Sequence, residues 1–370
     1  MSKHISKYWL PVVVVLVIVG AILVFIQRGS YFELPKGETV PLRSIGDDSI
    51  TSGDNSSDIP VLSDDKISKT IPKPHVSVRE MFVTDGVKHS IAIDEILSGG
   101  PQKDGIPSID NPKFVSVKEI KNVDDFLNDD SIGLGVIRNG DIRFYPYQIL
   151  VWHEIVNDIV GGEPLLVTYC PLCATGIVFD RIVNEKIIEF GVSGKLWRSN
   201  LLMYNRAIGE SNESLWSQVL GEAVLGMLTG TRLTIIPSDT VRFGDWRREY
   251  PDTKVLSSDT GINRSYGLDP YGSYYTDEGV AFGATFDDTR LHPKAFVLGV
   301  EIDGMFKAYH MSALEVGITN DSFSEKEVTI EKSDIGEVKM FVGEDKIPLS
   351  YIGGFWFSWL AVHPQTSLYK

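Results

Sequence analysis

The residues best suited to chemistry in this chain are two cysteines that stand two residues apart. Cys170 and Cys173 lie in the string VTYCPLCATGIVFDR, and they are the only cysteines among the 370 residues. The apolar runs on either side predict a turn between two strands at this point. Three kinds of chemistry fit such a pair: chelation of a metal ion, a redox-active disulfide, or a purely structural pair of thiols.

Metal binding is the leading expectation, because two thiolates on a tight turn can chelate one ion. One C-x-x-C supplies only two ligands, so the others must come from elsewhere in the chain. We expect Cys170, Cys173, His153 and His363 to form the metal site, with Glu154 as a candidate proton acceptor beside it. Thiolate and imidazole ligands suit copper or zinc, and no nucleotide cofactor is expected.

Two alternatives remain open, and the sequence does not decide whether the protein is an enzyme. A thiol–disulfide oxidoreductase would cycle Cys170 and Cys173. Such motifs usually open a helix that lowers the pKa of the nucleophile, whereas ATGIVF predicts a strand here. A cell-surface binding module would instead use the tyrosine-rich run SYGLDPYGSYYTD at 265–277, with structural cysteines.

An internal repeat surrounds these candidates. LGVIRNGDIRFYPYQIL at 134–150 matches LGVEIDGMFKAYHMSAL at 298–314, at an offset of 164 residues. Each copy predicts a hairpin, with Asn-Gly or Asp-Gly at its turn. The second copy has Gly317 at the position of His153 and contains no cysteine. The shared residues therefore explain a scaffold, and the unshared ones are candidates for specialised chemistry.

The elements that must position these residues are mostly strands. Short apolar runs such as PLLVTY, GIVF, KAFVLGVEI, KEVTI and EVKMFV are separated by Gly, Asn and Asp. Helical patterns interrupt them in YQILVWHEIVNDIV, SLWSQVLGEAVLGML, FGDWRREYP and GGFWFSWLAV. We therefore predict a β-rich α+β fold with two related half-units packed together, in a domain at 76–370.

The N-terminal part predicts a membrane anchor. Residues 8–26 carry no charge, and a helix of that length spans about 28 Å, enough to cross a bilayer. We expect a cytoplasmic tail at 1–7, the anchor at 8–26 and an acidic flexible linker at 27–75. The short basic N-terminus predicts that the domain lies outside the cytoplasm, at the cell surface or in a periplasm.

Composition narrows the classes of partner. The apolar fraction of 43% supports a packed core, and the net charge of −15 argues against nucleic-acid binding. No P-loop, dinucleotide-binding glycine motif or G-x-S-x-G is present. The expected partners are the membrane and a metal ion.

Several strings together resemble a known family. DGIPSIDNPKF, WHEIVND, VTYCPLCATGIVFDR, FGVSGKLWRSNLLMYNR, SLWSQVLGEAVLG, YPDTKVLSSDTG and FWFSWLAVHPQT are similar to those of the family catalogued as domain of unknown function 3179. The resemblance extends from about Asp94 to the C-terminus. It implies an exported or membrane-tethered bacterial or archaeal protein and no known activity. Ala174 departs from the family pattern, which usually has Gly there.

Overall fold

A long hairpin starts the part of the fold that carries the cysteines. Strand β5 (Ile132–Arg138) pairs antiparallel with β6 (Asp141–Pro146). Asn139 and Gly140 form the turn between them, with φ of 49° and 79°. Both angles lie in the left-handed region that this type of tight turn requires, which confirms the predicted hairpin.

The hairpin is the centre of a five-stranded sheet. Helix α5 (Phe243–Glu249) connects two of its strands and places Trp246 on β5. A Cβ atom at Gly135 would lie 2.3 Å from the Trp246 ring, so only glycine fits there. The order of the sheet is β17 (Asp239–Arg242), β5, β6, β18 (Lys254–Leu256) and β4 (Phe114–Ser116).

The same arrangement occurs a second time. Strands β19 (Phe296–Ile302) and β20 (Met305–His310) begin and end 164 residues after β5 and β6, and their turn is Asp303-Gly304. Helix α6 (Trp356–Val362) lies between β25 (Ile352–Phe355) and β26 (Ser367–Tyr369). We call residues 132–256 the first unit and residues 296–369 the second unit.

The tryptophan contacts extend the match beyond the hairpins. Trp359 packs on Gly299 as Trp246 packs on Gly135, with a Cβ atom at Gly299 again 2.3 Å from the ring. Each indole Nε1 donates to a threonine seven residues later, to Thr253 at 3.0 Å and to Thr366 at 2.9 Å. The repeat therefore includes a helix and two strands that the sequence comparison did not detect.

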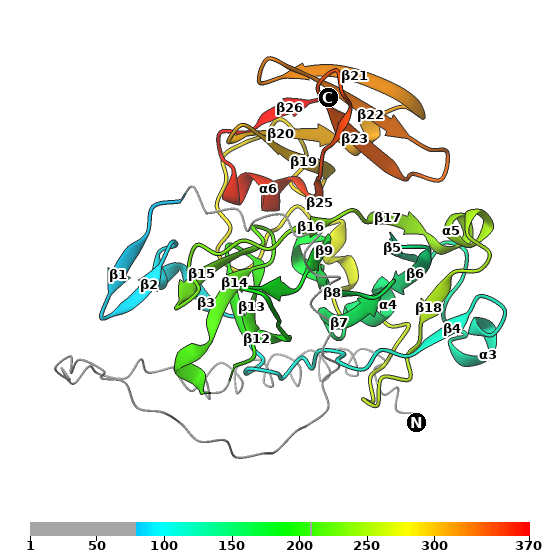
Figure 1. Ribbon diagram of the computed structural model, residues 1–370, viewed down its shortest axis with the longest axis horizontal. Coiled ribbons are helices and arrows are strands. Elements are labelled where there is room, and N and C mark those ends of the chain that lie inside the picture. The colour runs from blue at the N-terminus through cyan, green and yellow to red at the C-terminus, as the bar shows by residue number, and fades with distance from the viewer. Residues whose placement is uncertain (1–78, 208) are drawn as a thin grey trace, which may run out of the picture. The chain divides into compact units, whose positions relative to one another are not determined.

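A larger sheet joins the two units and carries the cysteine turn. Its strands at the centre are β9 (Thr175–Asp180) from the first unit and β25 from the second, with Gly176 opposite Gly353. Figure 1 shows the second-unit strands of this sheet in yellow to red. The order is β26, β20, β19, β25, β9, β8 (Glu163–Cys170) and β7 (Ile155–Val160), with β16 (Ile235–Ile236) beside β9.

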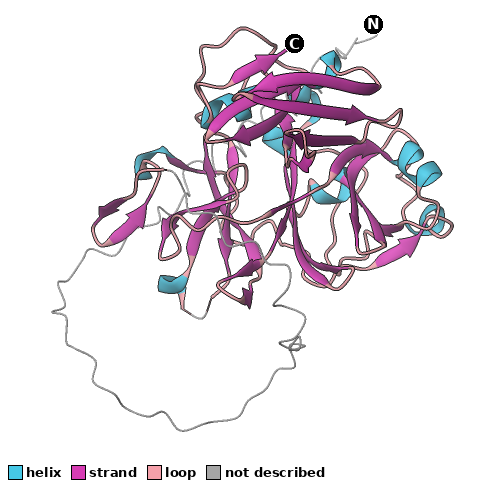
Figure 2. Ribbon diagram, turned by 45° about the horizontal axis from the view of Figure 1, so that its top comes forward, coloured by secondary structure: helices cyan, strands magenta, loops and turns pink. Residues whose placement is uncertain are grey.

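Three further sheets complete the fold of the described residues, whose strands are magenta in Figure 2. A seven-stranded sheet has the order β1 (Phe82–Thr84), β2 (Val87–His89), β15 (Glu222–Gly226), β14 (Ser214–Ser217), β13 (Asn200–Asn205), β12 (Phe190–Trp197) and β3 (Ile96–Ser98). The second unit adds β21 (Gly317–Phe323), β22 (Lys326–Lys332), β23 (Val338–Val342) and β24 (Ile347–Pro348). A short pair consists of β10 (Ile182–Val183) and β11 (Lys186–Ile187).

The remaining helical elements are short. In the part of the chain that the structure describes, the other two α-helices are α3 (Ile120–Val123) and α4 (Tyr147–Leu150). The 3₁₀ turns are η1 (Ile93–Glu95), η2 (Pro171–Cys173), η3 (Glu210–Asn212), η4 (Gly272–Tyr275) and η5 (Met311–Ala313). The fold is thus β-rich with few helices, as predicted for the α+β class.

Two predicted helices are wrong, and strands take their place. YQILVWHEIVNDIV forms one helical turn in α4 and then continues into β7. SLWSQVLGEAVLGML contains β14 and β15. Both strings have apolar spacing that also fits paired strands, and β-branched residues such as Ile155, Val156 and Val160 favour the pleated form. The helices predicted in FGDWRREYP and GGFWFSWLAV are confirmed as α5 and α6.

The computed structural model describes residues 79–370 except residue 208. The predicted tail, anchor and linker lie outside this range. Within the range, no helix is both long enough and apolar enough to span a bilayer.

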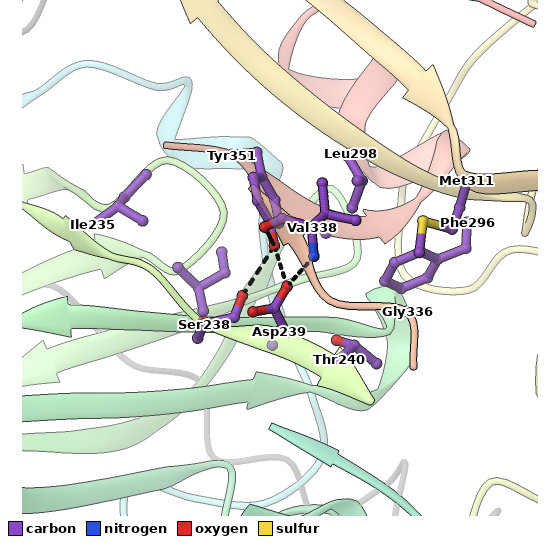
Figure 3. A pocket seen from close by; sticks show the side chains of 13 residues that line it. Ile235, Ser238, Asp239, Thr240, Phe296, Leu298, Met311, Gly336, Val338 and Tyr351 are labelled. Atoms are coloured by element: carbon purple, nitrogen blue, oxygen red, sulfur yellow. Dashed lines mark hydrogen bonds between the residues drawn. The ribbon is translucent and has the colours of Figure 1, made fainter. Parts of the chain in front are cut away.

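Asp239 links the two units next to a cavity of about 20 Å³, room for about one water molecule (Figure 3). Its Oδ1 accepts hydrogen bonds from the Tyr351 hydroxyl at 2.6 Å and from the Val338 N–H at 2.8 Å. Burial raises the pKa of Asp239 to about 6, although both hydrogen bonds act in the opposite direction. Between about pH 4 and 6, the folded protein therefore keeps a proton on the Asp239 carboxyl, whereas the unfolded chain has lost it.

Replacing Asp239 by Asn should remove a pH dependence of stability. Between about pH 4 and 6 the folded state binds more protons than the unfolded state, so the stability of the parent falls as pH rises. The free energy of unfolding of the parent should therefore decrease relative to that of Asp239→Asn across this window. Urea unfolding of both proteins, with the exposed Asp334→Asn as the control, measures the difference. A difference that stays constant with pH would contradict the raised pKa.

Candidate functional site

The cysteine turn connects two central strands of the joining sheet. Cys170 is the last residue of β8, η2 follows, and Ala174 leads into β9. Ala174 has φ of 48° and ψ of 29°, the left-handed conformation that glycine adopts most easily. This geometry gives a physical reason for the glycine expected at this position, and it means that Ala174 is held there by its surroundings.

Both thiols are free and lie in the largest apolar core cluster. Cys170 is 1% exposed and Cys173 is 0% exposed. Their sulfur atoms converge on one acceptor, the backbone oxygen of Ser199, which lies 3.7 Å from Cys170 Sγ and 3.3 Å from Cys173 Sγ. A pair of thiols in such an arrangement can share a proton or close into a disulfide.

The shared acceptor sits on an unusual hairpin turn. Arg198 and Ser199 form the two-residue turn between β12 and β13, with φ of 50° and 67°. Asn and Gly are preferred in this kind of turn, so Arg and Ser carry a conformational cost. Arg198 is held by Glu95 at 3.1 Å, and the Ser199 N–H donates to Phe282 at 2.9 Å. Contacts from distant segments therefore fix the turn beside the thiols.

Glu154 lies beside Cys170, in the corner between α4 and β7. It has φ of 58°, and its backbone oxygen accepts the Tyr169 N–H at 2.8 Å. Burial raises the pKa of the Glu154 carboxyl well above its usual value, and the nearby Cys170 raises it further. The Glu154 carboxyl therefore lies close enough to Cys170 for the charges of the two groups to interact.

The thiols differ in acidity. Burial and the contact with Cys173 raise the pKa of Cys170. Burial also raises the pKa of Cys173, but hydrogen bonds from the Cys170 thiol and the Asn200 amide, with the nearby Ser358 hydroxyl, lower it below the ordinary value. Cys173 is therefore the sulfur better able to carry negative charge.

Part of the tyrosine-rich run covers the cysteine turn. The Tyr274 hydroxyl donates to the backbone oxygen of Leu172 at 3.0 Å. Tyr271 and Tyr275 pack against the same core cluster. The buried Lys294 ammonium lies 3.7 Å from the centre of the Tyr274 ring and donates to the Asp277 oxygen at 2.6 Å. The run therefore packs over the cysteine turn and belongs to its surroundings.

His153 is fully buried, and both of its ring nitrogens have partners away from the cysteines. Nδ1 lies 2.7 Å from the Pro107 oxygen, and Nε2 lies 2.6 Å from the Tyr266 hydroxyl. Burial lowers the pKa of His153, so the ring stays neutral at neutral pH. These contacts give it a structural role that ties β7 to the loops around it.

His363 occupies a scaffold position of the repeat. It follows α6, stacks on Phe306 with 3.7 Å between ring centres, and packs at a tilt against Trp359 with 4.2 Å between ring centres. Tyr250 takes the corresponding place after α5 and packs on Trp246 at 4.4 Å. The unit without cysteines carries this histidine, so the repeat itself explains why a ring is found there.

The four-ligand metal site stays a prediction, and in this structure His153 and His363 contact groups other than the cysteines. Within residues 79–370, setting aside 208, no three side chains among His, Cys, Asp and Glu come together in a way that could hold a metal ion. The contacts of the two histidines were not predicted, because a helix was expected around His153 and the repeat of α5 and α6 was not recognised. Cys170 and Cys173 share one acceptor, and Glu154 lies close enough to Cys170 to interact with it electrostatically.

The cysteine turn lies in a part of the chain that matches a protein-family model. The model of the family described as "Protein of unknown function (DUF3179)" matches residues 103–347. The chain belongs to this family. The match includes the cysteine turn, Glu154 and His153, and it ends before His363. The search of the curated proteins and the search of the solved structures found no match.

Several residues of the site were not predicted from the sequence. Ser199 and Asn200 belong to FGVSGKLWRSNLLMYNR, where two polar residues interrupt apolar runs, which is a weak turn signal. Gln218 and Ser358 lie inside apolar strings. A polar residue within an apolar string could have been flagged as a buried hydrogen-bonding group, but its partner could not.

Exchange of His363 for Tyr should preserve the fold and change its acid response. Burial, with Arg79 and Arg232 nearby, lowers the pKa of His363 to about 3. Below about pH 6.5, His363 binds a proton in the unfolded chain but not in the folded protein. The free energy of unfolding of the parent therefore decreases as pH falls. Chemical unfolding at pH 7, 6, 5 and 4 should show that the stability of His363→Tyr increases relative to that of the parent at each lower pH. Parallel curves would show that His363 titrates normally.

Proposed function

We propose that this protein is a dithiol redox protein in which Cys170 and Cys173 alternate between two thiols and one disulfide. The observation that carries the proposal is that both sulfurs lie within reach of one carbonyl oxygen in a buried site. A buried carboxyl and an amide donor lie beside them, so the site contains groups that can hold a charge and exchange a proton.

The order of the steps follows from the acidity of the two thiols. The Cys173 thiolate attacks a disulfide of a partner molecule, forms a mixed disulfide and releases one thiolate of the partner. The Glu154 carboxyl, which burial keeps protonated, gives its proton to that departing thiolate and becomes ionised. It then takes the proton of the Cys170 thiol, whose sulfur attacks Cys173. The Cys170–Cys173 bond forms as the second partner sulfur leaves as a thiolate. The protein loses two electrons, and the partner disulfide gains them.

A helix N-terminus, which assists many C-x-x-C motifs, is replaced here by side chains. Chain segments that are distant in sequence supply the Asn200 amide, the nearby Ser358 hydroxyl and the Glu154 carboxyl. The substrate must be small or must displace Tyr274, because both sulfurs are covered. A mixed disulfide with a large protein would require the tyrosine run to move.

The proposal includes the location predicted from the N-terminal sequence. A single-pass anchor at 8–26, with the domain outside the cytoplasm, would place the thiols where disulfides form and persist. The acidic linker would hold the domain away from the bilayer. The two units are then related scaffolds, of which the first has acquired the cysteines at a turn where the second has SDIGE.

Disulfide closure tests the function directly. The purified protein should lose two thiols on treatment with a small disulfide, and mass spectrometry should find Cys170 joined to Cys173. Cys170→Ser should instead trap the mixed disulfide on Cys173. Two thiols that persist in a folded protein, or one equivalent of copper or zinc found by elemental analysis, would contradict the dithiol proposal; the metal would restore the metal-binding prediction.

Glu154→Gln should slow the second step. Removal of a proton acceptor typically costs about 100-fold or more in rate. Stopped-flow measurement of the mixed disulfide should show normal attack by Cys173 and slow closure by Cys170. Glu163→Gln, at the far end of β8, provides a matched control that changes the charge equally. Equal closure rates in the parent and in Glu154→Gln would remove Glu154 from the mechanism.

A further inference from the structure

Asn200 connects the cysteine turn to a buried polar network. It is the first residue of β13 and is only 1% exposed. Its Oδ1 accepts the Val219 N–H at 2.9 Å, and its Nδ2 donates to Gln218 Oε1 at 2.9 Å. The same Nδ2 lies 3.6 Å from Cys173 Sγ.

The network fixes which way each amide points. The Ile177 carbonyl can only accept, so the Thr168 hydroxyl donates to it, at 2.7 Å. Thr168 must then accept from Gln218 Nε2, at 3.0 Å, which leaves Gln218 Oε1 facing the Thr175 hydroxyl and Asn200. The Ile177 carbonyl therefore determines the orientation of the Gln218 amide, through the Thr168 hydroxyl.

Counting donors leaves one hydrogen for the sulfur. The Val219 N–H can only donate, so Asn200 must turn its oxygen toward it and its NH₂ group away. One hydrogen of that group goes to Gln218, and the other faces Cys173. Every member of the network is buried, so a different orientation would leave buried polar groups unpaired, which is unfavourable.

We propose that Asn200 is a positioning residue whose locked amide makes Cys173, and not Cys170, the sulfur that carries the negative charge of the dithiol. The inference deepens the proposed function and supplies the reason for the order of its two steps. The Ser199 oxygen, 3.3 Å from Cys173 Sγ, can accept a hydrogen bond from the Cys173 thiol while that thiol is protonated.

Other groups that face Cys173 act in known directions. Cys170 donates to it, Glu154 on the α4–β7 corner disfavours its charge, and Tyr274 from the covering run lies close enough to interact electrostatically. Cys170 itself is contacted by the backbone N–H groups of Leu201 and Cys173, yet burial still keeps it protonated. Asn200 is thus an uncharged side chain that donates to Cys173, and the buried network fixes the direction of its amide.

The test measures the Cys173 thiolate without any disulfide chemistry. In a Cys170→Ser background only one thiol remains, and its ultraviolet thiolate absorbance can be followed against pH. Adding Asn200→Ala should leave about tenfold less thiolate at neutral pH, because a hydrogen bond to a charged group has been removed. Thr168→Val is the matched control: it breaks the same network without touching the donor to sulfur.

The outcomes separate this inference from the proposed function. Equal thiolate titrations in Asn200→Ala and Thr168→Val would overturn the role of Asn200, whether or not the parent forms a disulfide. A parent that forms no disulfide, with thiolate lost only in Asn200→Ala, would overturn the redox function and support the inference. If Asn200→Ala does not fold, Asn200→Ser, which is shorter and adds no charge, replaces it and must show the same loss.

Discussion

The structure depends on one glycine in each of two strands, at the point where a tryptophan ring packs against the backbone. Gly135 and Gly299 allow the indoles of Trp246 and Trp359 to lie against the backbone. Each indole also holds the strand that follows its helix, through a threonine hydroxyl. This contact fixes the helix against the hairpin and sets the parallel pairing of the strand that follows. In the first unit the strand placed in this way, β18, in turn pairs with β4.

Because β9 pairs with a strand of the second unit, the cysteine turn lies in the interior rather than at a surface loop. Burial of ionisable groups usually suppresses charge, and Cys170 and Glu154 show that effect. Cys173 departs from it because fixed donors surround its sulfur. The site therefore separates the acidity of two chemically identical thiols by unequal hydrogen bonding, and a helix dipole is not required.

The sequence predicted the parts of this picture that depend on short-range patterns. The hairpins, the turn at the cysteines and the helices α5 and α6 follow from turn residues and local periodicity. The partners of His153 and His363 could not be predicted, because Pro107, Tyr266 and Phe306 are far away in the chain. Asn200 and Gln218 were missed for the same reason. Their function lies in the direction of an amide, which only the folded network determines.

The pairing of β9 with β25 also has a consequence for the order in which the chain becomes protected. Gly354 lies so close to the cysteine turn that a Cβ atom there would meet Thr175 at 2.3 Å and the Cys173 oxygen at 3.2 Å. Residues 352–362 therefore close one wall of the thiol site, although they are synthesised about 180 residues after Cys173. A nascent chain would expose both thiols until nearly the whole sequence has emerged, so a protein of this design has a long interval during which its cysteines can be oxidised or captured before they are enclosed.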